Sequence, residues 1–311
     1  MCGIAGLIYR DGDGGGAIGR DMTRMLQSMK HRGPDSTGYA LYGPRSDSFV
    51  MRVKLAEAND RDDTEAEGRL RRRKRELEAR MRSLGARIAN IDEENDYALT
   101  VTFDYDGDLQ QLADGVEAVK NAEVLSLGHS LEIIKDLGDA ESVATQYGLG
   151  GFKGTHAIGH VRMATESDVD IASAHPYWAY PFPDVAVVHN GQLTNYHQWR
   201  RRLERSGHRF QSDCDSEVIA VYLAEKLADG VELEDAIRQS VEDFDGVFTY
   251  ICVTEDALGV AKDELAAKPL VLYESDELVA LASEEIAIRE VLEEEIETHD
   301  PYEGEVMVWK R

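Results

Sequence analysis

The chain has 311 residues, a net charge of -26 and a hydrophobic fraction of 42%, enough apolar residues for a substantial core. Its negative charge repels nucleic acids and anionic membranes, so we expect neither as a partner. No apolar run approaches the roughly 18 residues of a membrane span, and the N-terminus lacks the features of a signal peptide. We therefore predict a globular protein of the cytoplasm. Its ten Lys and twenty-four Arg leave a surface rich in carboxylates, which suits a salt-rich cytoplasm, although an acidic protein at ordinary salt is the alternative.

The first 45 residues predict a strand, a helix and a second strand. The helix is amphipathic, and the strand after it contains "STGYALYG". The stretch "SFVMRVKL" (48–55) has apolar residues at strand period. The predicted apolar face of the helix comprises Ile18, Met22, Met25, Leu26 and Met29.

Residues 46–150 differ in composition and predict an inserted α/β subdomain. Charged residues dominate 56–95, where 68–88 predicts an exposed helix. A strand over 97–105 and helices over 108–122 and 130–149 follow. The run "RLRRRKR" has no interleaved aromatic residues and is flanked by acidic ones. A solvated helix face or a protein contact is therefore favoured over a nucleic-acid site.

From residue 155 onward, short buried strands alternate with helices. Strands are predicted in "THAIGHVRMA" and "VAVVHNG", helices over 195–207 and 215–230, and further strands in "GVFTYICVT", "ALGVAK" and "PLVLYE". Helices separated by runs of neighbouring strands predict an α+β layered architecture.

Cys2 follows the initiator methionine in "MCGIAGLIYR". Methionine aminopeptidases act when the second residue is small, so Met1 is expected to be removed. The α-amine, with an ordinary pKa near ~8, could then accept a proton from the thiol, whose ordinary pKa is ~8.5. Nucleophile and general base would form one unit. The alternative is that Cys2 is a small apolar residue that begins a strand. The other cysteines, Cys214 and Cys252, show neither disulfide nor metal-ligand spacing.

Polar residues stand at the ends of the predicted strands downstream. Arg162 follows a buried strand, and its guanidinium can bind a carboxylate with two hydrogen bonds. Asn190 and Gly191 offer an amide donor and an open backbone N–H, the components of an oxyanion hole. Asp215 begins a helix and could bind an ammonium group. Taken singly, they could be a surface arginine, a turn and a helix cap. Together with a nucleophile, they are what hydrolysis of an α-amino acid side-chain amide requires.

Five motifs, "MCGIAG", "HRGPDSTG", "GHVRMAT", "HNGQLTN" and "SDCDSE", resemble in this order those of class II glutamine amidotransferases. These enzymes are N-terminal nucleophile hydrolases, and the match covers about 2–45 and 155–290 of a domain expected to span 2–311. The resemblance implies a four-layer α/β/β/α sandwich. It also implies roles for seven residues: nucleophile Cys2, oxyanion donors Asn190 and Gly191, glutamine ligands Arg162 and Asp215, and pocket-bordering Arg32 and Gly33.

Within that family, "SAHPYW", "KDELAAKPL" and the insertion look most similar to stand-alone glutaminase subunits of split glutamate synthases and of N-methylglutamate synthase. The implied chemistry is glutamine hydrolysis through a thioester, with no metal or cofactor. The sequence has no phosphate-binding glycine loop and no dinucleotide motif. We therefore expect a separate synthase subunit to accept the ammonia, and any flavin or iron-sulfur site to belong to that partner.

The sequence departs from the common pattern at Cys214, where a small or polar residue is usual. With no adjacent base, Cys214 is interpreted as a pocket-wall residue. Two alternative functions remain open, another N-terminal nucleophile amidase such as an acylase, and a non-enzymatic glutamine sensor. An acylase needs no ligands for both ends of an amino acid, and a sensor could lose Cys2.

Overall fold

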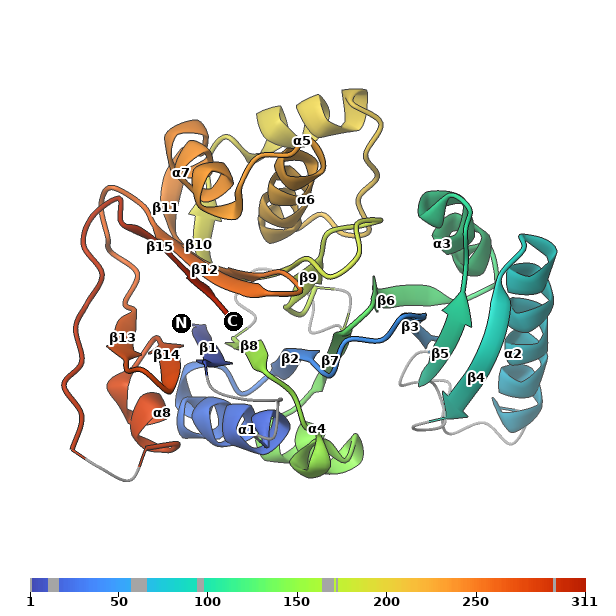
Figure 1. The fold of residues 1–311 in the computed structure, drawn as a ribbon, viewed down its shortest axis with the longest axis horizontal. Helices are drawn as coiled ribbons and strands as arrows, with labels where there is room; N and C mark the ends of the chain where they lie inside the picture. Colours follow the sequence, from blue (N-terminus) through green and yellow to red (C-terminus); the bar gives the residue numbers. More distant parts are fainter. Residues whose placement is uncertain are drawn as a thin grey trace.

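The computed structural model describes residues 2–10, 17–56, 66–93, 98–163, 171, 173–292 and 295–311. Two antiparallel sheets stack face to face, and helices cover the outer face of each (Figure 1). The predicted four-layer α/β/β/α sandwich is confirmed. Its inner layers meet through contacts of the central strands β1 (Gly3–Tyr9) and β8 (His156–Arg162) with β10 (Ala186–Leu193) and β11 (Gly246–Val253).

The first sheet has six strands in the order β13-β14-β1-β8-β2-β7. Helices α1 (Ile18–Ser28), α4 (Ala140–Gln146) and α8 (Glu285–Arg289) pack on its outer face (Figure 1). The predicted apolar face of α1 is buried, as its 3.6-residue period requires. The remaining strands are β2 (Ser36–Tyr42), β7 (Leu131–Leu137), β13 (Val271–Glu274) and β14 (Leu278–Ala282).

The second sheet has five strands in the order β15-β12-β11-β10-β9. Its outer face is covered by α5 (Tyr196–Arg205), α6 (Asp215–Ala228) and α7 (Leu233–Asp243) (Figure 1). The helices predicted over 195–207 and 215–230 are therefore present. The remaining strands are β9 (Tyr177–Trp178), β12 (Ala257–Lys262) and β15 (Val306–Lys310).

A third, four-stranded sheet in the order β4-β5-β3-β6 lies beside the sandwich (Figure 1). Helices α2 (Ala66–Ser83) and α3 (Leu109–Glu117) pack against it. Its strands are β3 (Phe49–Lys54), β4 (Arg87–Glu93), β5 (Ala98–Asp104) and β6 (Glu123–Gly128).

Two features of the predicted insertion, 46–150, differ from expectation. The helix predicted over 130–149 is wrong in its first half, because β7 pairs with β2 along seven residues and only α4 is helical. Both elements pack with the first sheet, so the third sheet accounts for 49–128 alone. The helix predicted over 68–88 ends at Ser83 and gives way to β4, which is paired with β5.

The carboxylate of Asp184 holds the turn between the third sheet and the first. It accepts hydrogen bonds from the backbone N–H groups of His129 at 2.8 Å and of Ser130 and Leu131 at 3.0 Å. Gly128 ends β6 at this point, and a Cβ there would stand 2.1 Å from Asp184 Oδ1. The side chain therefore replaces the backbone partners that this turn lacks.

Candidate functional site

Cys2 directly precedes β1 and is half-buried at the junction of the two sheets. Its backbone carbonyl accepts hydrogen bonds from Arg32 Nε at 3.1 Å and from Asn190 Nδ2 at 3.2 Å. Its Sγ lies 3.9 Å from the carbonyl oxygen of Met163, the residue after Arg162. Three of the predicted site segments therefore meet at Cys2.

Arg32 and Gly33 connect Cys2 to the end of β8. The buried Arg32 also donates from Nη1 to Glu284 Oε1 at 2.6 Å. Burial would raise the pKa of Glu284, but hydrogen bonds from Arg32 and His31 outweigh it and lower the pKa. A Cβ on Gly33 would lie 2.5 Å from the backbone N and C of Arg162, so only glycine fits without a shift.

Arg162 is the last residue of β8 and is 8% exposed. It pairs with Ser36 of β2, and its carbonyl accepts the N–H of Asp35 at 3.1 Å. Strand β8 thus places Arg162 at the same end of the sheet as Cys2, since Gly3 pairs with Val161.

Asn190 and Gly191 lie in β10, opposite Thr249 and Phe248 of β11. Gly191 has φ +146°, and a Cβ there would lie 2.1 Å from the carbonyl oxygen of Val247. Glycine is therefore required at this position. The side chain of Asn190 extends toward Cys2, as its hydrogen bond shows.

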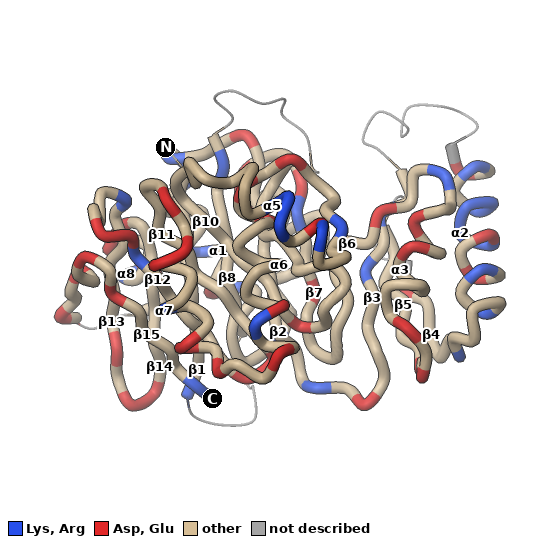
Figure 2. Tube along the Cα trace, turned by 90° about the horizontal axis from the view of Figure 1, so that it is seen from above, with Lys and Arg blue, Asp and Glu red and all other residues tan. Residues whose placement is uncertain are grey.

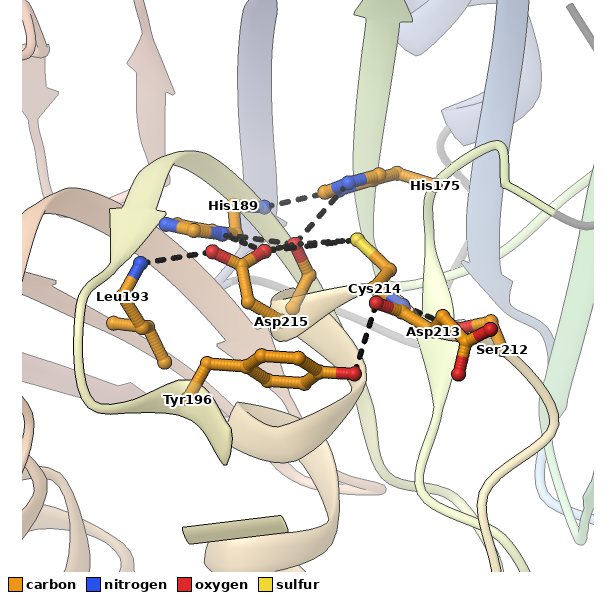
Figure 3. A network of polar contacts seen from close by, with 9 residues as sticks. His175, His189, Leu193, Tyr196, Ser212, Asp213, Cys214 and Asp215 are labelled. Atoms are coloured by element: carbon orange, nitrogen blue, oxygen red, sulfur yellow. Dashed lines mark hydrogen bonds and ion pairs between the residues drawn. The ribbon is translucent and has the colours of Figure 1, made fainter. Parts of the chain in front are cut away.

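Asp215 is the first residue of α6, and Figure 3 shows the network around it. Its Oδ2 accepts the N–H of Leu193 at 2.8 Å, and its Oδ1 lies 3.6 Å from His189 Nδ1. Burial would raise the pKa of Asp215, but His189 and the Leu193 N–H outweigh it and lower the pKa to about 2. The N-cap position falls at Cys214, and the contacts of Asp215 with Leu193 and His189 are with β10 rather than with the backbone of α6.

Cys214 lies beside Asp215, with Sγ 3.4 Å from Ser216 Oγ. Burial, followed by the negative charge of Asp215, raises the pKa of its thiol, which disfavours the thiolate. Its role as a pocket-wall residue stays a prediction.

Sequence reasoning assigned no role to His175 and His189, which Figure 3 shows beside Asp215, or to Ser216, which contacts both histidines and Asp215. All three stand inside motifs named above, His175 in "SAHPYW", His189 in "HNGQLTN" and Ser216 in "SDCDSE". Glu284, the partner of Arg32, carried no sequence signal because it lies 252 positions away.

Within the described ranges, no group of three or more His, Cys, Asp or Glu side chains could hold a metal ion. In the same part of the chain, no helix has the length and apolar character needed to cross a bilayer.

The four-layer sandwich, with a cysteine at the start of a central strand, is the architecture of an N-terminal nucleophile hydrolase. Comparison with known proteins agrees with this architecture and identifies the family. The glutamine amidotransferase domain family matches residues 160–290. The chain is 42% identical to a candidate glutamine amidotransferase of Methanothermobacter thermautotrophicus across 100% of both proteins. It is 35% identical to the glutamine amidotransferase-like protein GlxB of Rhizobium meliloti, over 91% of this chain and 89% of that protein. The chain belongs to the class II glutamine amidotransferases, a family of enzymes.

The fold also matches the glutamine phosphoribosylpyrophosphate amidotransferase of Bacillus subtilis, solved with ADP and GMP, with a TM-score of 0.61 and 19% identity. That match covers 99% of this chain and 47% of the other, so this chain spans about half of that enzyme. At this identity the likeness concerns the fold.

Proposed function

We propose that this chain hydrolyses glutamine to glutamate and ammonia with Cys2 as nucleophile. The observation that carries the proposal is the pair of hydrogen bonds from Arg32 and Asn190 to the Cys2 carbonyl. They fix Cys2, the first residue after removal of Met1, beside the side-chain amide of Asn190. An amide nitrogen has two hydrogens, so Asn190 can hold Cys2 with one and offer the other to substrate.

After removal of Met1, the α-amine of Cys2 takes the thiol proton and the thiolate attacks the side-chain carbonyl carbon of glutamine. The carbonyl oxygen becomes an oxyanion, which Asn190 Nδ2 and the Gly191 N–H stabilise. When the intermediate collapses, the C–N bond breaks and the Cys2 ammonium protonates the departing nitrogen. Water then cleaves the thioester, releasing glutamate and restoring the thiol.

Arg162 and Asp215 recognise the two charged ends of glutamine in this proposal. The guanidinium binds the α-carboxylate in two parallel hydrogen bonds, and the Asp215 carboxylate binds the α-ammonium. The low pKa of Asp215 supports this role, because it keeps the carboxylate ionised at every physiological pH. Arg32 and Gly33 border the pocket and hold Cys2 and Arg162.

The ammonia passes to a separate synthase subunit, of the glutamate synthase or N-methylglutamate synthase type. The support for this partner is the resemblance of the "SAHPYW" and "KDELAAKPL" segments to those of glutaminase subunits of such synthases. A protein that co-purifies with this chain would be identified as that subunit if it uses free ammonia when alone and glutamine when this chain is added.

The test is covalent trapping of Cys2. A glutamine analogue with an electrophilic carbon in place of the amide should modify the peptide that begins at Cys2, raising its mass by that of one analogue molecule less any leaving group. Peptides containing Cys214 or Cys252 should keep their mass. Cys2→Ala should abolish glutamine hydrolysis while leaving the fold intact. Intact mass of active protein that still carries Met1, or turnover near the wild-type rate in Cys2→Ala, would contradict the mechanism.

A further inference from the structure

His189 directly precedes Asn190 and Gly191 in β10, and the proposed chemistry leaves its imidazole without a role. The residue is 3% exposed. Its Nδ1 lies 2.8 Å from Ser216 Oγ and 3.6 Å from Asp215 Oδ1. Its Nε2 is buried and has no hydrogen-bond partner among the residues that the structure describes.

Ser216 contacts this ring directly, and His175, seen beside it in Figure 3, contacts Ser216 and the backbone of His189. The Nδ1 of His175 accepts the backbone N–H of His189 at 3.2 Å, so in a neutral His175 the proton lies on Nε2. That Nε2 lies 3.3 Å from Ser216 Oγ, to which it can donate. The Ser216 hydroxyl therefore contacts three side chains, those of His175, His189 and Asp215.

One imidazole consequently touches two parts of the proposed glutamine pocket. On one side, Asp215 is held between Leu193 N–H, at 2.8 Å from Oδ2, and His189 Nδ1 near Oδ1. On the other side, a Cβ on Gly191 would stand 3.0 Å from His189 Nε2. The ring of His189 therefore lies between the Asp215 carboxylate and the backbone of Gly191.

We propose that His189 is a positioning residue that makes the site selective for amides bearing an α-ammonium group. This inference rests on the proposed function and deepens it. His189 and the Leu193 N–H together aim the Asp215 carboxylate at the α-ammonium of glutamine. Without the ring, Asp215 loses one of its two supports from β10, and glutamine binds less tightly while the reaction at Cys2 is little changed.

The experiment compares kcat and KM for glutamine and for its deaminated analogue, which keeps the amide and the α-carboxylate. His189→Leu should raise KM for glutamine about 10- to 100-fold, because the Asp215 carboxylate loses the polar neighbour 3.6 Å from its Oδ1. Its kcat for glutamine and its kcat/KM for the deaminated analogue should change less than about threefold. His189→Asn places a polar atom near the former Nδ1 and should restore most of the affinity.

Ser216→Ala removes the hydroxyl that holds the ring and should give the same KM effect, so the test does not depend on His189→Leu folding. His156→Asn is the matched control, because His156 is also a buried histidine of the sandwich, stacked on Tyr42 with ring centroids 4.2 Å apart. It should leave KM for glutamine unchanged.

Equal losses on both substrates, or an unchanged KM for glutamine, would overturn the role of His189 while Cys2-dependent hydrolysis still stands. A wild-type chain without Cys2-dependent hydrolysis would instead contradict the proposed function. A binding readout that needs no turnover, the glutamine-induced rise in Tm of Cys2→Ala, should shrink when His189→Leu is added.

Discussion

Gly33 has no side chain, and this allows the loop that carries Arg32 to pack against the backbone of Arg162. A Cβ would meet the backbone of Arg162 at 2.5 Å, so an alanine here would push against the end of β8. We predict that Gly33→Ala lowers the free energy of unfolding by about 1 to 3 kcal/mol and raises KM for glutamine. Urea denaturation and kinetics check both effects. Gly151→Ala is the control, because no atom lies within 4 Å of its Cβ position, and it should change stability by less than about 0.5 kcal/mol.

The ionisation of Asp215 makes a second prediction at the scale of one residue. Its pKa falls from the ordinary 3.8 to about 2 in the folded protein, so the charged form stabilises the fold above pH ~4 and this contribution is lost as pH falls toward 2. Relative to Asp215→Asn, the contribution of this charge to the free energy of unfolding should be on the order of 2 kcal/mol at pH 5 and about half that at pH 3. Urea denaturation of wild type and variant at both pH values measures the difference. A difference that grows toward pH 3 would contradict the assignment.

Among the elements, the link between sandwich and third sheet depends on Asp184. Asp184→Ala leaves three backbone N–H groups without their acceptor and places alanine at φ +57°. We expect a loss of about 2 to 4 kcal/mol in the free energy of unfolding, from the unpaired donors and the strained backbone.

Asp184→Asn should lose less, because asparagine tolerates this backbone conformation and keeps one acceptor oxygen. Asp106→Ala, in an exposed pair with Arg87, should have almost no effect on urea denaturation. Equal losses in Asp184→Ala and Asp184→Asn would show that the hydrogen bonds to the turn contribute little.

The elements also show where sequence patterns suffice. Helix α1 was predictable because its apolar residues recur at one period and all are buried. Strand β7 was not, because "LEIIKDL" has clustered apolar residues that fit helix and strand alike, and pairing with β2 decides between them. A signal was available in Gly138, with φ +105°, and Asp139, which caps α4 through Ser142 N–H.

The same distinction holds for the site. Cys2, Arg162, Asn190, Gly191 and Asp215 stand in motifs, so their identity could be predicted. Their contacts could not, because Glu284 reaches Arg32, and Ser216 reaches His189, only through the packing of distant segments. Sequence spacing carries no information on such contacts, which tertiary structure alone creates.

For the whole molecule, charge is unevenly distributed. The net charge is -26, yet α2 carries eight basic and three acidic residues in eighteen positions, visible as the blue helix at one end of the molecule in Figure 2. Its apolar residues, including Leu77 and Met81, are buried against the third sheet, while Arg72 and Arg75 are exposed. The basic face of α2 therefore offsets part of the repulsion in an otherwise acidic molecule.

This arrangement predicts how stability responds to salt. Raising KCl from 0.1 to 1 M shortens the Debye length from about 10 to 3 Å, so self-repulsion weakens and the free energy of unfolding should rise. The double variant Arg72→Gln/Arg75→Gln removes positive charge. It should lower the free energy of unfolding at 0.1 M KCl and make that free energy rise more steeply with KCl concentration. Removing negative charge at two exposed positions in Asp276→Asn/Glu277→Gln should flatten this rise. Urea denaturation at each KCl concentration gives the slope of the free energy of unfolding against salt. Salt also affects apolar burial, but this effect is the same in all variants because they share one core. Three identical slopes would mean that net charge does not limit the stability of this fold.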